Sequence, residues 1–201
     1  MHLGLDFDNT LISYDILFRR VAVEQGLIPP EIEANKNAVR DYLRRVNKEN
    51  AWTMLQGDVY GGRILEAEPY PGMWEALQFI AKRSIPMTII SHKTRLPYLG
   101  ESWDLHLAAR GWLKKLKIDL LTGPNISDEK VFFEPSKVEK CKRIVDLGCT
   151  HYIDDLPEIL TMLPNNIIKI HFSPNSDNIH NKDWMLMKSW DELVGLLNLN
   201  V

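Results

Sequence analysis

The sequence predicts an α/β fold, with a mostly parallel, Rossmann-like sheet covered by helices on both faces. Short apolar runs alternate with segments of helical periodicity along the chain, which is the pattern of parallel α/β proteins. The apolar runs are continuous, as expected of strands that are buried on both faces. A long helical segment between the first two runs indicates an additional small insertion.

The candidate strands are five apolar runs, at residues 2–7, 86–91, 131–133, 151–154 and 167–172. Helical periodicity is found in residues 105–116 and again near the C-terminus, from Trp190 to Leu197. Two helix starts carry the residue pair of a capping box, Ser136 with Glu139 and Ser189 with Glu192. The helix that begins at Ser136 is expected to carry Val138, Cys141 and Val145.

The segment between the first two candidate strands is too long for one crossover helix. A βαβ unit needs about thirty residues, and residues 73–84 supply its helix, so residues 14–68 are surplus. Val39, Leu43 and Val46 recur there at helical spacing. Turn residues are expected to close the segment, at Gly57, Gly61, Gly62, Pro69, Pro71 and Gly72. We expect a core domain of residues 1–13 and 69–201 and an inserted helical cap of residues 14–68.

The composition of the 201-residue chain is that of an ordinary globular protein, with 45% hydrophobic and 25% charged residues. The net charge of −3 gives no basic footprint, so no nucleic-acid partner is expected. The two cysteines have no metal-type spacing, and they suit a reduced cytosolic protein. No apolar stretch reaches the length of a membrane span, and the N-terminus lacks the shape of a signal peptide. We expect a cytoplasmic protein without a membrane partner.

Two aspartates, Asp6 and Asp8, follow the first apolar run in the sequence Asp-Phe-Asp-Asn-Thr. At the end of a strand they can converge on the carboxyl edge of the sheet, where their charges would repel each other. A hard divalent cation would relieve this repulsion. The alternative is a turn or capping pair, which is common for aspartate and asparagine.

Polar residues also follow three other positions of the expected sheet. Ser91 ends the second run, and its hydroxyl could bind phosphate oxygens or cap a helix. Lys137 lies in the first turn of a helix, where a cation opposes the helix dipole, so it faces an anion or is a surface lysine. Asp154 and Asp155 end the fourth run, and capping of the helix that begins at Pro157 explains only one of them.

These residues, in this order, resemble the four motifs of the haloacid dehalogenase (HAD) superfamily. The resemblance covers nearly the whole chain, and the insertion lies where that family has its helical C1-type cap. It implies the HAD-like α/β fold, Mg²⁺ as cofactor and phosphoryl chemistry on an aspartate. The four motifs are D-x-D-x-T at Asp6, Asp8 and Thr10, a serine at Ser91, a lysine at Lys137, and an acidic pair at Asp154 and Asp155.

The resemblance implies a role for each catalytic residue. Asp6 would be the nucleophile that attacks phosphorus. Asp8 would be the general acid that protonates the leaving oxygen, and then the base that activates water. Ser91 and Lys137 would bind the phosphoryl oxygens, where their donors stabilise the charge of the transition state.

The resemblance also implies the ligands of the metal ion. Mg²⁺ would be held by Asp6, by the backbone carbonyl of Asp8 and by an acidic residue of the fourth motif. Asp155 is expected to be the direct ligand of that pair. Asp154 would then orient Lys137 or a metal-bound water.

The expected function is hydrolysis of a small phosphorylated metabolite, such as a sugar phosphate or a nucleoside monophosphate. Asp8 favours this phosphatase chemistry, because dehalogenases of the family lack the second aspartate. The alternatives are a phosphomutase or phosphotransferase of the same fold, and a catalytically silent phosphate-binding module.

Some residues keep open roles. His92 and Lys93 follow Ser91 as loop residues or ligands. Trp52, Tyr60 and Arg63 of the insertion could contact a leaving group, although aromatic residues in a small helical unit often serve packing. The sequence does not indicate an oligomeric state.

Overall fold

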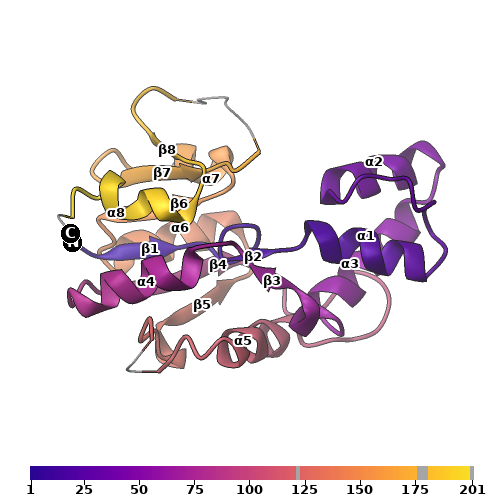
Figure 1. The fold of residues 1–201 in the computed structure, drawn as a ribbon, viewed down its shortest axis with the longest axis horizontal. Coiled ribbons are helices and arrows are strands. Elements are labelled where there is room, and N and C mark those ends of the chain that lie inside the picture. Colours follow the sequence, from indigo (N-terminus) through magenta and orange to yellow (C-terminus); the bar gives the residue numbers. More distant parts are fainter. Residues whose placement is uncertain (121–122, 176–180, 200–201) are drawn as a thin grey trace. The chain divides into compact units, whose positions relative to one another are not determined.

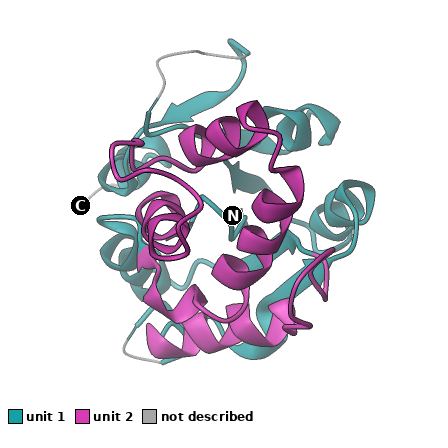
Figure 2. Ribbon diagram, turned by 90° about the vertical axis from the view of Figure 1, so that its right-hand side faces the viewer, with its two compact units in different colours: residues 1–11, 69–93, 117–201 teal, residues 12–68, 94–116 magenta. Residues whose placement is uncertain are grey.

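The chain forms two compact units in the computed structural model, which describes residues 1–120, 123–175 and 181–199. The first unit comprises Met1–Leu11, Pro69–Lys93 and Lys117–Val201, and the second comprises Ile12–Glu68 and Thr94–Leu116 (Figure 2). Residues 94–116 therefore group with the inserted segment. The division into a core of residues 1–13 and 69–201 and a cap of residues 14–68 stays a prediction.

The first unit is built on a six-stranded parallel sheet, which confirms the predicted α/β fold. Its strand order is β5-β4-β1-β6-β7-β8 (Figure 1). The strands are β1 (Leu3–Leu5), β4 (Met87–His92), β5 (Val131–Glu134), β6 (His151–Asp154), β7 (Ile168–Phe172) and β8 (Met185–Met187). The five candidate strands correspond to the first five of these. β8, at the edge of the sheet, was not among the candidate strands.

Helices cover both faces of this sheet (Figure 1). On one face α6 packs on β4 and β5, and its neighbour α7 packs on β6 and β7. On the other, α4 contacts η3 and α8, and α8 contacts β8. Covering on both sides explains the continuous apolar character of the central strands. The helices are α4 (Met73–Lys82), η2 (Asp128–Lys130), α6 (Lys137–Asp146), α7 (Pro157–Met162), η3 (Trp190–Glu192) and α8 (Leu193–Leu196).

One of the two predicted capping boxes forms in part, because the Glu139 carboxylate bonds the Ser136 hydroxyl and not the Ser136 backbone N–H. The Ser136 side chain accepts a hydrogen bond from the Glu139 backbone N–H at 3.2 Å, and its hydroxyl donates to the Glu139 carboxylate. The prediction of a second capping box, at Ser189 and Glu192, is wrong, because the Ser189 side chain makes no capping hydrogen bond. The Glu192 carboxylate instead accepts from the Lys188 N–H at 2.9 Å, which satisfies a donor just outside the helix.

The buried face of α6 includes a lysine. Val138 and Val145 are exposed, and the residues that face the sheet are Lys140, Cys141 and Ile144. The sequence had placed Val138, Cys141 and Val145 on this helix, and of these only Cys141 is buried. A buried lysine at position 140 shifts the inward face, and its charge is compensated by groups that come from other elements.

Gly4 of β1 lies against the ring of Tyr152 on the neighbouring strand, with which it is in register. A Cβ atom at position 4 would lie 2.6 Å from Cδ2 of Tyr152. Tyr152 has no room to retreat, since it is fully buried and its hydroxyl donates to the Ile90 carbonyl. Glycine is therefore required here for the close approach of two central strands.

Gly4→Ala is expected to lower the free energy of unfolding by about 1–3 kcal/mol, which is the usual cost of overpacking a core. Urea unfolding of the variant beside the wild type measures the change. Gly195→Ala in α8 is the matched control, because a Cβ atom there meets nothing within 4 Å. An unfolding free energy of Gly4→Ala at or above that of the wild type would contradict the steric argument.

The second unit is helical, as predicted for the insertion, and two short strands pair as a two-stranded sheet at the ends of the inserted segment. Val39 and Leu43 of α2 are buried, whereas Val46 is exposed beyond the end of this helix. Gly57 is buried inside α3, so its assignment to the closing turn is wrong. The elements are β2 (Ile12–Ser13), α1 (Asp15–Glu24), α2 (Lys36–Arg45), α3 (Glu49–Tyr60), η1 (Ile64–Glu66), β3 (Glu68–Pro69) and α5 (Leu105–Lys115).

The side chains suggested as contacts of a leaving group are held within this unit. Trp52 is buried and its ring lies 5.1 Å from that of Phe18. Tyr60 makes an edge contact with Phe18 at 5.4 Å, and Arg63 forms an ion pair with Glu24 at 2.9 Å. The packing alternative accounts for the two aromatic rings, and intra-unit ion pairing accounts for the arginine.

The described helices are short, and α3 is the longest of them at 12 residues. Within the described ranges, no helix has the length and apolar character that crossing a bilayer requires.

Candidate active site

The chain turns sharply after β1 and directs acidic side chains to the carboxyl edge of the sheet. Asp6 continues the strand, with its N–H donating to the Ile153 carbonyl at 2.9 Å. Asn9 adopts a left-handed conformation with φ of 57°, which asparagine tolerates better than most residues. The N–H of Leu11 then donates to the Phe7 carbonyl at 3.0 Å and closes the turn.

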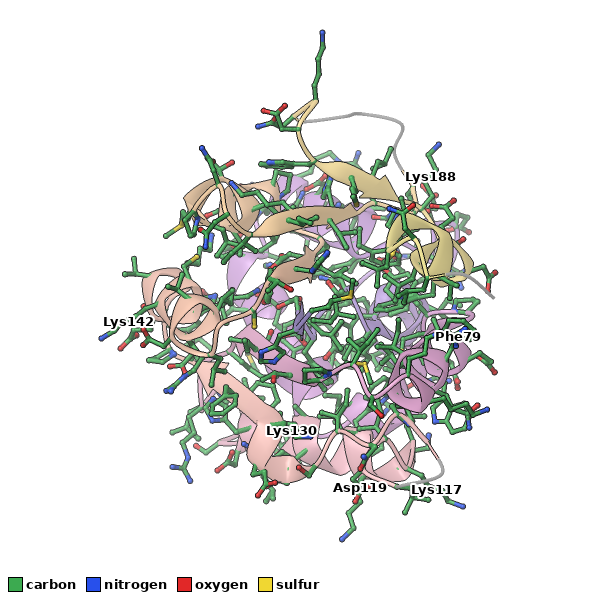
Figure 3. All side chains as sticks on the ribbon, turned by 90° about the vertical axis from the view of Figure 1, so that its left-hand side faces the viewer. Phe79, Lys117, Asp119, Lys130, Lys142 and Lys188 are labelled. Atoms are coloured by element: carbon green, nitrogen blue, oxygen red, sulfur yellow. The ribbon has the colours of Figure 1, made fainter. Side chains whose placement is uncertain are left out.

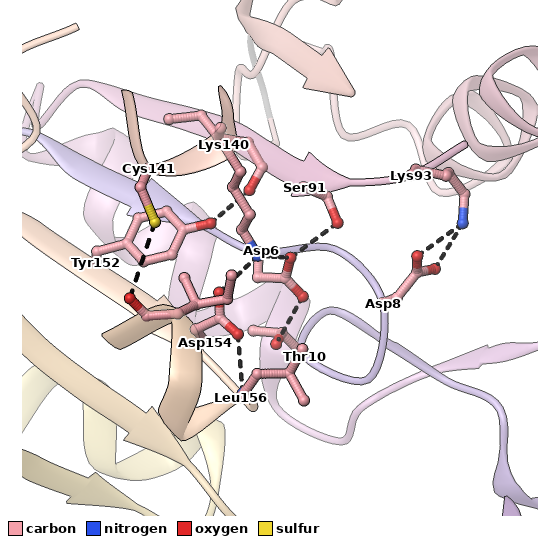
Figure 4. Close-up of polar contacts among 12 residues, drawn as sticks. Asp6, Asp8, Thr10, Ser91, Lys93, Lys140, Cys141, Tyr152, Asp154 and Leu156 are labelled. Carbon is pink, nitrogen blue, oxygen red and sulfur yellow. Dashed lines mark hydrogen bonds and ion pairs between the residues drawn. The ribbon is translucent and has the colours of Figure 1, made fainter. Parts of the chain in front are cut away.

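The Asp6 carboxylate is buried and accepts hydrogen bonds from three side chains (Figure 4). Its Oδ1 accepts from the Ser91 hydroxyl at 2.8 Å and from the Lys140 ammonium at 2.6 Å. Its Oδ2 accepts from the Thr10 hydroxyl at 3.2 Å. The donors come from β4, α6 and the turn after β1, so three separate segments fix the position of this one carboxylate.

Lys140 bridges two buried carboxylates. Its Nζ lies 2.6 Å from Asp6 Oδ1 and 2.6 Å from Asp154 Oδ2, and 5.6 Å from the centre of the Tyr152 ring. Burial alone would lower the pKa of Lys140, but Asp154 and Asp6 outweigh it and hold that pKa above its ordinary range. Burial raises the pKa of the Asp154 carboxyl, while the Lys140 ammonium acts in the opposite direction. Lys140 is therefore charged in this site.

The lysine of this cluster is not Lys137, the residue that the sequence suggested. Lys137 lies in the first turn of α6, and its ammonium pairs at the surface with Glu158. Lys140, almost one turn further along the same helix, is buried. Lys142 is exposed and points outward (Figure 3). The sequence signal for Lys140 was its position on the apolar face beside Cys141. That signal is normally outweighed by the preference of lysine for the surface.

Asp8 forms an ion pair with a different lysine, Lys93, which directly follows β4. The Lys93 ammonium donates to both Asp8 oxygens, at 2.7 and 2.9 Å (Figure 4). It also lies 5.5 Å from the centre of the Phe7 ring. The sequence left Lys93 without a role, because nothing local distinguishes it from a loop lysine. His92, the last residue of β4, is half-buried, and this burial lowers the pKa of its imidazole.

Three carboxylates form a group that fits a metal ion. Asp6, Asp154 and Asp155 each offer an oxygen, and these oxygens lie within 4.8 Å of one another. When all three carboxyls are ionised, the Lys140 ammonium offsets one of their negative charges, and a divalent cation would neutralise the other two. An all-oxygen donor set suits Mg²⁺. The predicted metal ligands also included Asp8, through its backbone carbonyl. The Asp8 carboxylate does not belong to the group of three carboxylates.

Comparison with known proteins identifies the fold. No protein-family model matches the chain, and a search of curated proteins finds no relative. Solved structures, in contrast, match it over nearly its whole length.

One such structure is a predicted phosphoglycolate phosphatase from Haemophilus somnus 129pt, with a TM-score of 0.59 and 13% identity, covering 98% of this chain and 97% of that one. A HAD family hydrolase from Deinococcus radiodurans R1, with bound phosphate and sodium, has a TM-score of 0.56 and 15% identity, covering 98% and 94%. A dehalogenase has a TM-score of 0.57 and 14% identity, covering 99% and 97%. At these identities the similarity concerns the fold alone, and the chain has the fold of the haloacid dehalogenase superfamily.

Proposed function

We propose that this chain is a Mg²⁺-dependent phosphatase of the haloacid dehalogenase superfamily, which hydrolyses a small phosphate monoester through an aspartyl-phosphate. The observation that carries the proposal is the Asp6 carboxylate. It is held by Ser91, Thr10 and Lys140 at the carboxyl edge of the sheet, beside a carboxylate group that fits a divalent cation. This is the edge at which open α/β sheets bind their ligands.

Asp6 would act as the nucleophile. One of its oxygens attacks phosphorus, the bond from phosphorus to the leaving oxygen breaks, and Asp8 gives that oxygen a proton. Water then attacks the phosphorus of the aspartyl-phosphate and transfers a proton to Asp8, while the bond from phosphorus to Asp6 breaks. The second step restores both aspartates to their starting states.

The cations of the site make this attack possible. A carboxylate approaching a phosphate dianion is repelled, and Lys140 places one positive charge next to Asp6. Mg²⁺, held by Asp6 with Asp155 or Asp154 and the Asp8 carbonyl, would supply further positive charge to the phosphoryl group when it is bound. The Ser91 hydroxyl, which donates its one hydrogen to Asp6 in this structure, would turn that hydrogen toward a phosphoryl oxygen when substrate binds.

Asp8 favours phosphate esters over organic halides as substrates. A halide leaves without a proton, so a dehalogenase has no use for an acid at this position. An alkoxide needs one. The Asp8 carboxylate is partly exposed and lies outside the carboxylate group of Asp6, which suits a residue that exchanges protons with a leaving group. Phosphate bound to the similar hydrolase supports phosphoryl chemistry in this fold.

The experiment that tests this function is a panel of phosphorylated metabolites and an aryl phosphate, assayed for release of inorganic phosphate. Hydrolysis of at least one ester supports the proposal. Transfer of the phosphoryl group to a second substrate without phosphate release would assign the chain to the phosphotransferases instead. No turnover of any ester, with phosphate binding retained, would make it a silent binding module.

Removal of the metal ion is expected to abolish this hydrolysis. Excess chelator should bring phosphate release to background, Mg²⁺ should restore it, and Ca²⁺ should restore little because its coordination is looser. Asp155→Ala is expected to raise the Mg²⁺ concentration needed for half-maximal activity more than Asp154→Ala does. Activity that persists in excess chelator would contradict the metal requirement, and the reverse order of the two variants would exchange the ligands.

We also propose that residues 14–68 act as a cap that selects the substrate. Its role is separable from the chemistry, because the carboxylate and lysine side chains of the site come from the first unit.

A further inference from the structure

We infer that Lys93 is a positioning residue for Asp8, which fixes the Asp8 carboxylate in place for its two proton transfers. The inference rests on the proposed function, in which Asp8 is the acid and then the base.

The ion pair of Lys93 and Asp8 is anchored on the lysine side. The Lys93 side chain is 3% exposed and that of Asp8 is 22% exposed. The backbone N–H of Lys93 donates to the Glu134 carbonyl of β5 at 2.9 Å, and its ammonium lies 5.5 Å from the centre of the buried Phe7 ring. The lysine is therefore held by the sheet, and the aspartate, on a turn, is oriented by the lysine.

The contact to Asp8 constrains the carboxylate more than a single bond would. The ammonium donates to both oxygens, at 2.7 and 2.9 Å, so it restricts both the direction of the side chain and the rotation of its carboxylate. Among the staggered rotamers of the Asp8 side chain, this contact selects one in which both oxygens face the ammonium. A fixed orientation raises the rate of proton transfer, because the donor must meet the leaving oxygen at hydrogen-bond distance.

The two lysines of this edge divide between the two aspartates of the first motif. Lys140 contacts Asp6, and Lys93 contacts Asp8. Carboxylates two residues apart could otherwise compete for one cation. With separate partners, the Asp6 carboxylate lies in the group of three carboxylates that fits a metal ion, and the Asp8 carboxylate lies outside it.

The position of Lys93 also matches the charge changes of the reaction. When Asp8 gives its proton to the leaving oxygen, it becomes a carboxylate whose new charge lies next to the Lys93 ammonium. When water attacks the aspartyl-phosphate, the same carboxylate takes the released proton. Lys93 itself gains and loses no proton in either step, and its ammonium stays next to the Asp8 side chain.

The test is a double-mutant cycle of Lys93→Met and Asp8→Asn, measured as the single-turnover rate of leaving-group release from an alkyl and an aryl phosphate. Lys93→Met alone is expected to lower the rate on the alkyl phosphate by about 10²-fold, at the low end of acid–base catalysis. The loss on the aryl phosphate should be several-fold smaller, because a good leaving group needs less protonation. In the Asp8→Asn background, Lys93→Met should cause no further loss on either substrate.

Two further variants separate positioning from structure. Lys93→Arg keeps the cation and should recover part of the rate, and Lys142→Met removes an exposed lysine of α6 and should leave all rates unchanged. Urea unfolding shows that each variant is folded. If Lys93→Met does not fold, the double variant, in which both charged groups are replaced by neutral ones, is compared with Asp8→Asn alone.

The possible failures are distinguishable. If the wild type releases no phosphate from any ester, the proposed function fails, and this role of Lys93 fails with it. If the wild type is active but Lys93→Met and Asp8→Asn lower the rate by independent factors, Lys93 does not act through Asp8. Equal losses on alkyl and aryl phosphates in folded Lys93→Met would also overturn the positioning role and leave the phosphatase intact.

Discussion

Asp6→Asn is expected to abolish hydrolysis of every phosphate ester while the chain remains folded. An amide does not displace the leaving group, so no aspartyl-phosphate forms, and loss of a covalent nucleophile lowers kcat by about 10⁴-fold or more. Folding should survive, because asparagine has the shape of aspartate and removes one charge from the group of three carboxylates. Lys140 keeps its second partner, Asp154, in this variant.

Two measurements check the role of Asp6. Phosphate release under saturating Mg²⁺ gives the loss of activity, and mass spectrometry of the acid-quenched wild type should find the phosphoryl group on the peptide that contains Asp6. Asp146→Asn, at an exposed position at the end of α6, is the matched control and should behave as the wild type. Turnover of Asp6→Asn at the wild-type rate would exclude the covalent mechanism.

Lys140→Met is expected to lower kcat by about 10³-fold and to destabilise the chain as well. The activity falls because the charge that lets Asp6 approach the phosphate is lost. The stability falls because two buried carboxylates lose the cation they share, and removing one partner from a buried ion pair typically costs about 3–5 kcal/mol. Both losses follow from the same two contacts of 2.6 Å.

The matched control is Lys137→Met on the same helix. Lys137 pairs only with Glu158 among the contacts described for its side chain, and exposed pairs contribute roughly 0–1 kcal/mol. This variant should therefore retain both activity and stability. Unfolding is measured in urea with chelator present, because a bound cation would offset the excess negative charge of Lys140→Met. If Lys137→Met were the inactive variant, the lysine of the site would be the one that the motif order suggested.

Several polar residues of the site could be predicted because each lies where a predicted strand ends. Asp6, Ser91 and Asp154 each lie at the carboxyl end of an apolar run. Parallel strands bring these ends to one edge of the sheet, so a linear pattern of apolar runs already implies their proximity. The same pattern determined the parallel sheet itself. It missed β8, an edge strand that is only partly buried.

The lysines could not be predicted in this way. Lys140 is 134 residues from Asp6 along the chain, but its Nζ lies 2.6 Å from Asp6 Oδ1. The charge of Lys140 can be buried only because carboxylates at the ends of two strands, those of Asp6 and Asp154, lie beside it. Sequence rules place lysine at the surface, and they indicated Lys137 because a cation in the first turn of a helix opposes the helix dipole unless an anion lies nearby. That anion is Glu158, at the surface.

The sequence by itself determined the α/β fold, the helical insertion and the strand ends that carry Asp6, Ser91 and Asp154, because hydrophobic periodicity is a local property of the chain. Only the tertiary structure decided which lysine meets which aspartate. Lys140 and Lys93 are buried cations, and a buried charge is stable only beside opposite charges that distant segments supply.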